Sequence, residues 1–207
     1  MIRAFLLIFA PGPAWERILR VERGIALRAA VYLLPLLVLA SAGEAYGLVH
    51  WGKWQGVIGR IHKYSVGEAV LIEALQILLS LLLVAVNAAM IKAFGDTFRG
   101  RHTYAQSLPL AIYSLTPLFV LRVLDGFSRI SPLMVWAVGI LLCLRVLYPG
   151  VPRVMDPDPP NAFGIYVMSA ILMGLTSGLV YFIATWYFQG KFAELDSLIS
   201  SWGARLF

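Results

Sequence analysis

The sequence predicts an all-α integral membrane protein, a bundle of five transmembrane helices with an amphipathic surface helix at each end. The first observation behind this fold class is composition: 60% of the 207 residues are hydrophobic and only 14% are charged. Soluble domains are nearer half apolar and a quarter charged. The mean hydropathy of +0.80 agrees. Such a chain has too little polar surface to cover itself in water, and a bilayer is the solvent that fits.

The second observation is that five apolar stretches are long enough to cross a membrane. A helix needs about 20 mostly apolar residues to span roughly 30 Å of hydrocarbon. The stretches that qualify are 25–49, 69–94, 105–124, 131–148 and 162–188. Aromatic residues typical of the membrane interface lie near their ends: Trp51, Trp54, Tyr148, Trp186 and Tyr187. Lipid admits only helices or closed barrels, and these runs lack the alternation of barrel strands, so we expect helices.

The segments outside the spans, 1–24 and 189–207, are predicted to be amphipathic and to flank a membrane domain over 25–188. In the first, Pro13 suits an initial helical turn and Trp15 starts an apolar face that continues through Ile18 and Leu19. In the second, apolar residues recur at helical spacing: Phe192, Leu195, Leu198, Ile199, Trp202 and Leu206. Such faces lie on the membrane surface, or pack on the bundle or on a second copy, and the sequence leaves these alternatives open.

The connections differ in character. Residues 50–68 form a longer polar and aromatic loop, 95–104 a short basic one, and 125–130 a tight turn. Residues 149–161 are rich in proline and aspartate, and this composition predicts that no helix continues through them. Three prolines lie inside spans and are predicted to bend them: Pro35, Pro109 and Pro117.

The basic residues predict the orientation. The net charge is +6, from 17 Lys+Arg against 11 Asp+Glu. With a cytoplasmic N-terminus, ten of the 17 basic residues fall on the cytoplasmic side and seven on the other, and the segment before the first span supplies five of the ten: Arg3, Arg17, Arg20, Arg23 and Arg28. We expect an N-in, C-out protein, most consistent with a bacterial inner membrane. Anionic lipid headgroups account for the basic excess better than nucleic acid does, so lipids are the expected partners and nucleic acid is not.

Six ionisable residues lie within or beside spans and are candidates for a functional site. They are Glu44, Glu73, Lys92, Arg122, Asp125 and Arg145. Most fall near the end of a span, where long side chains reach the interface at little cost, so we interpret them as anchors of the span ends. Arg122 and Asp125 are three residues apart on one helical face and are predicted to be able to pair.

One polar stripe runs deeper. Glu73, Gln76, Ser80 and Asn87 follow helical spacing in the second span. Buried amides in lipid usually bond to a neighbouring helix. The stripe therefore predicts either a seam between helices or the wall of a cavity.

Small residues recur every four positions in two spans. Gly43 and Gly47 form one ridge, and Ala170, Gly174 and Gly178 form another. Such ridges let helix backbones approach closely, inside one bundle or between proteins. They indicate other membrane proteins, or a second copy of this chain, as possible partners.

Sequence motifs of catalysis and cofactor binding do not occur. The three histidines, His50, His62 and His102, lie in predicted loops without metal-binding spacing, and no GxSxG, P-loop or dinucleotide fingerprint is present. The single cysteine, Cys143, excludes a disulfide within the chain and is read as a small buried hydrophobe. We therefore expect no enzyme activity, cofactor or metal.

Several short motifs recur along the chain in a recognisable order. They are Pro13-Ala14-Trp15, Ala93-Phe94-Gly95, Tyr104-Ala105-Gln106-Ser107, Ala111-Ile112-Tyr113-Ser114-Leu115-Thr116-Pro117 and Tyr148-Pro149-Gly150-Val151-Pro152. With these motifs the chain resembles the Yip-domain family of Ypt/Rab-interacting proteins. The resemblance covers most of the chain, from about residue 10 to 188, and its most specific part is a short basic loop followed by a span with Tyr-Ser-x-x-Pro. It implies five membrane helices with a cytoplasmic N-terminus, and it supplies no catalytic residues.

The same resemblance bears on partners. Eukaryotic members act in vesicle traffic and bind small GTPases through a cytosolic N-terminal extension. This sequence has almost no extension and lacks an Asp-Leu-Tyr-Gly-Pro type motif, which puts GTPase binding in doubt and is closer to the short prokaryotic branch. The leading hypothesis is a non-enzymatic protein that organises membrane or assists other membrane proteins. The alternatives are a small transporter, channel or lipid-handling subunit and, less favoured, an enzyme acting on lipid.

Overall fold

The structure is a computed structural model that describes residues 7–19, 24–55, 60–98, 103–127 and 130–206. Its elements, in chain order, are α2 (Pro11–Leu19), α3 (Ile25–His50), β1 (Lys53–Gln55), β2 (Arg60–His62), α4 (Val66–Thr97), α5 (Tyr104–Leu121), η1 (Arg122–Gly126), α6 (Pro132–Val154), α7 (Pro159–Phe188) and α8 (Ala193–Leu206). Five helices are long and apolar enough to cross a membrane, one in each predicted span. The predicted five-helix membrane bundle is confirmed.

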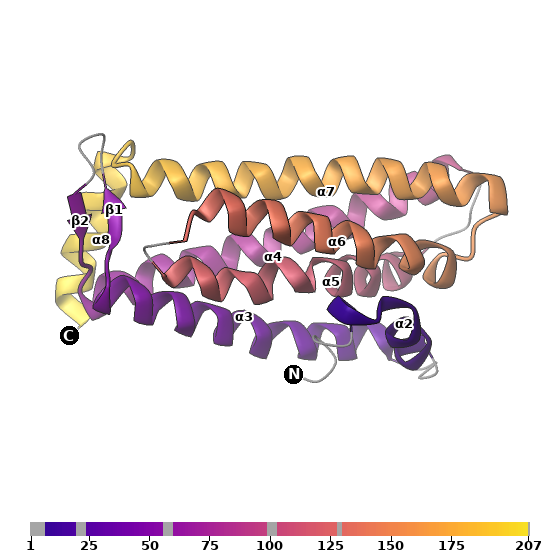
Figure 1. Cartoon of the computed structure of the whole chain (residues 1–207), viewed down its shortest axis with the longest axis horizontal. Coiled ribbons are helices and arrows are strands. Elements are labelled where there is room, and N and C mark those ends of the chain that lie inside the picture. The colour runs from indigo at the N-terminus through magenta and orange to yellow at the C-terminus, as the bar shows by residue number, and fades with distance from the viewer. Residues whose placement is uncertain (1–6, 20–23, 56–59, 99–102, 128–129, 207) are drawn as a thin grey trace.

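The five long helices run up and down along the long axis of the molecule (Figure 1). One end of the bundle carries the β1–β2 hairpin and α8, and we call it the hairpin end. The opposite end carries α2 (Figure 1). Helix α5 packs against α3, α4 and α6, whereas α7 packs against α4 and α6. The centre of the bundle is therefore built around α5.

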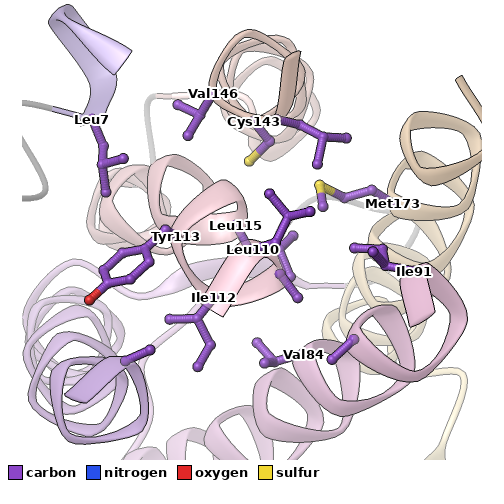
Figure 2. Close-up of a cluster of buried hydrophobic side chains, with 14 of the residues drawn as sticks. Leu7, Val84, Ile91, Leu110, Ile112, Tyr113, Leu115, Cys143, Val146 and Met173 are labelled. Atoms are coloured by element: carbon purple, nitrogen blue, oxygen red, sulfur yellow. The ribbon is translucent and has the colours of Figure 1, made fainter. Parts of the chain in front are cut away.

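The apolar core follows from this position of α5. Leu110, Ala111, Ile112, Tyr113 and Leu115 are at most 1% exposed. Figure 2 shows Leu110 and Leu115 between side chains of three other helices, namely Ile91 of α4, Cys143 of α6 and Met173 of α7. Close packing of this kind, rather than exclusion from water, holds helices together inside lipid.

The start of α4 is set by a capping box. The backbone N–H of Glu68 donates to Ser65 Oγ at 3.2 Å, and the Ser65 N–H donates to Glu68 Oε2 at 2.8 Å. This reciprocal pair satisfies two donors that the first helical turn leaves free. Helix α4 thus begins three residues before the predicted span.

A small β-hairpin occupies the predicted loop between the first two spans. Lys53 pairs with His62 and Gln55 with Arg60 in an antiparallel register. Gly52 precedes the hairpin with φ +71°, and a Cβ at this position would lie 2.4 Å from the His62 carbonyl oxygen. Glycine is therefore required here by both its backbone angle and the close contact. Each strand has three residues, too few for an alternating pattern to predict it.

The prediction that residues 149–161 interrupt helical structure holds only for residues 155–158, because α6 includes the first part of this segment and α7 (Pro159–Phe188) its last three residues. Helix α6 continues through Pro149 and Pro152 to Val154, and the turn at Asp156, with φ +43°, follows it. Each proline removes one hydrogen bond, to the carbonyl of Arg145 or of Tyr148. Both of those residues are exposed near the helix end, and a freed carbonyl costs least where polar surroundings can donate to it.

The two flanking helices pack on the bundle. In α2, Ala14, Trp15 and Ile18 are buried, and the Trp15 indole N–H donates to the Val146 carbonyl of α6 at 3.0 Å. Helix α8 packs on α4 and buries Ile199, while Leu198 and Trp202 stay exposed. The amphipathic patterns left open whether these helices lie on the membrane, on the bundle or on a second copy. In the structure both pack on the bundle, and an apolar face of α8 stays exposed.

Candidate functional site

A buried ion cluster joins three spans near the hairpin end. Glu44 of α3, Glu73 of α4 and Arg122 of η1 are 2%, 4% and 9% exposed. Arg122 Nε donates to Glu44 Oε2 at 2.8 Å, and Arg122 Nη2 donates to Glu73 Oε2. One guanidinium thus bridges two carboxylates from different helices, the forked geometry for which arginine is suited.

The hairpin adds a second cation to this cluster. Lys53 Nζ of β1 donates to Glu44 Oε1 at 3.1 Å and lies 4.1 Å from the centre of the Phe188 ring. Gln76 Nε2 approaches the same Glu44 oxygen at 3.5 Å. We use the name ion cluster for Glu44, Lys53, Glu73 and Arg122. It ties the hairpin to the ends of α3, α4 and η1.

The predicted ridge of Gly43 and Gly47 lies where η1 approaches α3. A Cβ on Gly47 would lie 2.2 Å from the Gly126 carbonyl oxygen, and one on Gly43 would lie 2.9 Å from Val123 Cγ1. At Gly47 the contact is with the Gly126 backbone, which leaves no room for a side chain, and at Gly43 the Val123 side chain occupies the space. Their close approach brings Arg122 within hydrogen-bond distance of Glu44.

The interpretation of the ionisable residues as span-end anchors is wrong for the cluster. Glu44, Glu73 and Arg122 are buried and paired with one another. Within the described part of the chain no ion pair joins Arg122 to Asp125, because the Arg122 guanidinium is held by the two carboxylates across the helix interface. Lys92 and Arg145 differ: Lys92 pairs with Asp96 on the surface, and Arg145 is exposed beside the Phe9 carbonyl.

A cavity of about 220 Å³ adjoins the ion cluster and is lined mainly by residues of α4, α5, η1, α6 and α7. Its charged and amide lining residues include Glu44, Lys53, Gln76, Arg122 and Asp125. Its apolar lining residues include Leu83, Leu118, Val135 and Phe188. Charged groups and hydrocarbon therefore line the same cavity.

The predicted polar stripe on α4 divides between this cavity and a seam. Gln76 and Ser80 line the cavity, whereas Glu73 belongs to the ion cluster. Asn87 is fully buried and its Nδ2 donates to the Leu83 carbonyl at 2.8 Å and to Thr176 Oγ1 of α7 at 2.9 Å. Asn87 thus makes the direct interhelical bond expected of a buried amide in lipid.

Three polar atoms of this region are buried without a hydrogen-bond partner among the described residues. They are the donor Arg122 Nη1 and the acceptors Glu73 Oε1 and Asp125 Oδ1. Each exposes less than 1 Å² of surface, so these atoms are enclosed by the protein and do not face the cavity.

The second small-residue ridge, on α7, makes few close contacts within the chain. A Cβ on Gly174 would meet nothing within 4 Å, and one on Gly178 would lie 3.5 Å from the Trp136 ring. Ala170 packs partly against the core. Unlike Gly43 and Gly47, Gly174 is not required for contact with another helix of this bundle.

The ion cluster could not be predicted as a unit from the sequence. The only signal for it was the presence of single charged residues inside apolar spans. No group of three His, Cys, Asp or Glu side chains among the described residues is arranged to hold a metal ion. The cluster is thus an arrangement of salt bridges beside a cavity.

Comparison with known proteins supports the resemblance noted in the sequence. A family model described as the Yip1 domain matches residues 5–182. No curated protein and no solved structure matches the chain. With the match extending over most of its length and through all but the last turns of the fifth span, the chain belongs to the Yip1 domain family.

Proposed function

We propose that this protein is a non-enzymatic membrane protein that assists or organises other membrane proteins by packing against them through α7. The observation that carries the proposal is the low burial of α7. In its most apolar window only 17% of the residues are buried, the lowest share among the five spans. A partner helix, from another protein or from a second copy, is the occupant that suits this face.

The chemistry of the face supports a helix as partner. Gly174 leaves open space beside its backbone, and Ile171, Leu175 and Leu179 stand exposed next to it. Small residues flanked by large apolar ones allow a second helix to approach closely and pack. Lipid tails would cover the same side chains, so the experiment must distinguish protein from lipid.

Site-specific photo-crosslinking in native membranes tests the proposal. A photoreactive residue replaces Leu175 on α7, and the matched control replaces Leu78 on α4, which is similarly exposed. We expect protein adducts from position 175 and few from position 78, and Gly174→Leu should reduce those adducts. Lipid adducts alone at both positions would refute the proposal, whereas adducts of doubled mass would identify a second copy as the partner.

We also propose that the α2 end faces the cytoplasm of a bacterial cell, as the basic residues of the sequence indicate. A cysteine at exposed Ser201 in α8 should react with a membrane-impermeant maleimide added to spheroplasts, and one at exposed Asp96 should not. Labelling of position 96 alone would reverse the orientation. Cys143 is fully buried, so the background labelling should be low.

A second candidate function is lipid handling, and the cavity beside the ion cluster favours it. A transport route would need polar groups facing a space within the membrane. Gln76 and Ser80 face such a space, but Asn87 is engaged with Thr176. The charged lining residues Glu44, Lys53 and Arg122 belong to the hairpin end of the bundle, which suits a bound amphiphile better than a path across the bilayer.

A further inference from the structure

We propose that the cavity beside the ion cluster takes one acyl chain of a phospholipid from the surrounding bilayer, whatever the headgroup of that phospholipid. The proposal rests on lipid handling, the second candidate function above, and is independent of lateral packing through α7. It names the part of the lipid that is bound and the residues that contact it.

One face of α7 lines the cavity over three turns. Its lining residues include Ser177, Val180, Tyr181, Ala184, Thr185 and Phe188. They recur at intervals of three and four residues, the spacing of one helical face. With Gln189 as the last of them, they cover about 18 Å of helix at 1.5 Å per residue. The wall that α7 provides is therefore long and runs along the helix axis.

Most of the surface that lines the cavity is hydrocarbon. Helices α4, α5 and α6 contribute Leu83, Leu118 and Val135 to it. The lining of an unfilled space loses van der Waals contacts, and apolar cavities exclude water but bind apolar molecules. An apolar ligand therefore suits this lining.

The charged lining residues are engaged by the protein itself. Glu44 accepts hydrogen bonds from both Lys53 and Arg122, and Arg122 also donates to Glu73. The unpartnered oxygen of Asp125, Oδ1, exposes less than 1 Å² and is closed to a ligand. These groups give no basis for choosing one headgroup over another, so the cavity recognises the hydrocarbon part of the lipid.

The position of the cavity indicates that its hydrocarbon comes from the bilayer. Ser177 lies near the middle of the span Asn161–Phe188. At the hairpin end the lining includes exposed residues, among them Phe127 and Gln189. The cavity thus extends from the surface of the bundle to the depth of acyl chains. A helix, about 10 Å wide, is too thick for a space of this length with a volume of about 220 Å³, whereas a single acyl chain is thin enough.

The test is photolabelling of the full chain in nanodiscs with a phosphatidylcholine that carries a diazirine within one acyl chain. Mass spectrometry of peptides assigns the adducts to residues. Three neighbours in α4 make the comparison. Leu83, 4% exposed, lines the cavity; Val84, 3% exposed, lies in the apolar core and is not part of the lining; Leu82, 58% exposed, reports contact with bulk lipid.

Two variants accompany the wild type. Ala184→Phe fills the cavity from α7, and Leu179→Phe adds the same bulk to the exposed face of α7. Thermal unfolding in detergent checks that each variant is folded.

We expect adducts on Leu83 and Leu82 and few on Val84. The Leu83 adducts should fall at least about tenfold in Ala184→Phe, a loss of about 1.4 kcal/mol in binding free energy, and stay unchanged in Leu179→Phe. Phosphatidylethanolamine and phosphatidylglycerol with the same acyl diazirine should label Leu83 equally well.

Labelling of Leu83 by one headgroup class alone would overturn headgroup independence, while lipid handling would stand. If Leu82 is labelled but Leu83 is not, or if Ala184→Phe leaves the Leu83 adducts unchanged, the acyl-chain site is wrong. In that case a phospholipid with the diazirine in its headgroup decides on lipid handling, which fails as well if no lining residue is labelled. If Ala184→Phe does not fold, the comparison of Leu83 with Val84 in the wild type decides.

Discussion

Helices α5 and α7 have similar hydropathy and opposite environments. Their most apolar windows average 1.6 and 1.9, yet 67% of the α5 window is buried and 17% of the α7 window. The two helices also differ in which side chains they bury. Ser107, Ser114 and Thr116 of α5 are fully buried, whereas large apolar residues such as Leu175 and Phe182 of α7 are exposed.

The comparison teaches that hydropathy alone does not separate the inside of a membrane bundle from its outside. Lipid tails are as apolar as leucine, so burial inside the bundle gains little from excluding water. Small and polar residues reach the interior because they permit close packing and interhelical bonds. Substitutions that weaken contacts of α5 and its continuation η1 should therefore cost more stability than substitutions that weaken contacts of α7.

The largest loss is expected from Arg122→Leu, at the start of η1. It leaves Glu44 and Glu73 buried without their shared cation, and breaking a buried ion pair from one side costs about 3–5 kcal/mol. Reversible unfolding in mixed detergent micelles measures the free energy of unfolding. Arg145→Leu, at an exposed arginine of α6, is the control and should change it by less than about 0.5 kcal/mol. Equal values for the two variants would show that the ion cluster does not stabilise the bundle.

The next largest loss of stability is expected from a leucine truncation in α5, compared with the same truncation in α7. Leu110→Ala in α5 empties a site where the leucine is fully buried, and such truncations cost about 2–5 kcal/mol. Leu175→Ala in α7 removes a side chain that is 69% exposed and should cost less than about 0.5 kcal/mol. The same unfolding assay measures both. A large loss at Leu175 would mean that the α7 face is covered by a partner in the sample.

Glycine substitutions should separate the two small-residue ridges. Gly47→Ala places a Cβ against the Gly126 backbone, and forced overpacking costs about 1–3 kcal/mol. Gly174→Ala meets nothing within 4 Å and should be neutral or slightly stabilising, because alanine is the better helix former. The measurement is the midpoint of unfolding of each variant, compared with that of the wild type. A loss at Gly174 without a partner present would contradict the open space described there.

The smallest effect belongs to the bond between α4 and α7. Asn87→Leu and Thr176→Val each remove one side of the Asn87–Thr176 hydrogen bond. Interhelical hydrogen bonds in membranes couple by about 0.6 kcal/mol on average. A double-mutant cycle in the unfolding assay should give a coupling near that value. Zero coupling would show that this bond does not help to hold α7 against α4.

The parts predicted from the sequence are those that hydropathy determines. The five spans, their order and the family resemblance follow from local patterns, which need no knowledge of neighbours. The end of α6 was missed because the penalty for Pro149 and Pro152 depends on whether water or headgroups reach the freed carbonyls, a property of position in the bundle. The hairpin was missed because three-residue strands carry no period.

The ion cluster was missed for a different reason. Glu44, Glu73 and Arg122 are 29 and 49 residues apart in sequence, and helical spacing relates only residues of one helix. The local partner of Arg122, at Asp125, was visible in the sequence, but its actual partners lie on α3 and α4. The glycine ridge at Gly43 and Gly47 marked the contact, without indicating which helix would fill it.

The ion cluster also has a consequence for the order in which the chain enters the membrane during synthesis. Glu44 arrives with the first span and Glu73 with the second, while Arg122 follows only at the end of the third. A charged residue in a helix resists insertion by about 2.5–3.5 kcal/mol at the bilayer centre, and less toward the ends. Glu44 can pair with Lys53 as soon as the hairpin follows the first span, but the cation partner of Glu73 emerges only with the third span. A nascent chain stopped before residue 122 should therefore remain beside the insertion machinery instead of moving into lipid.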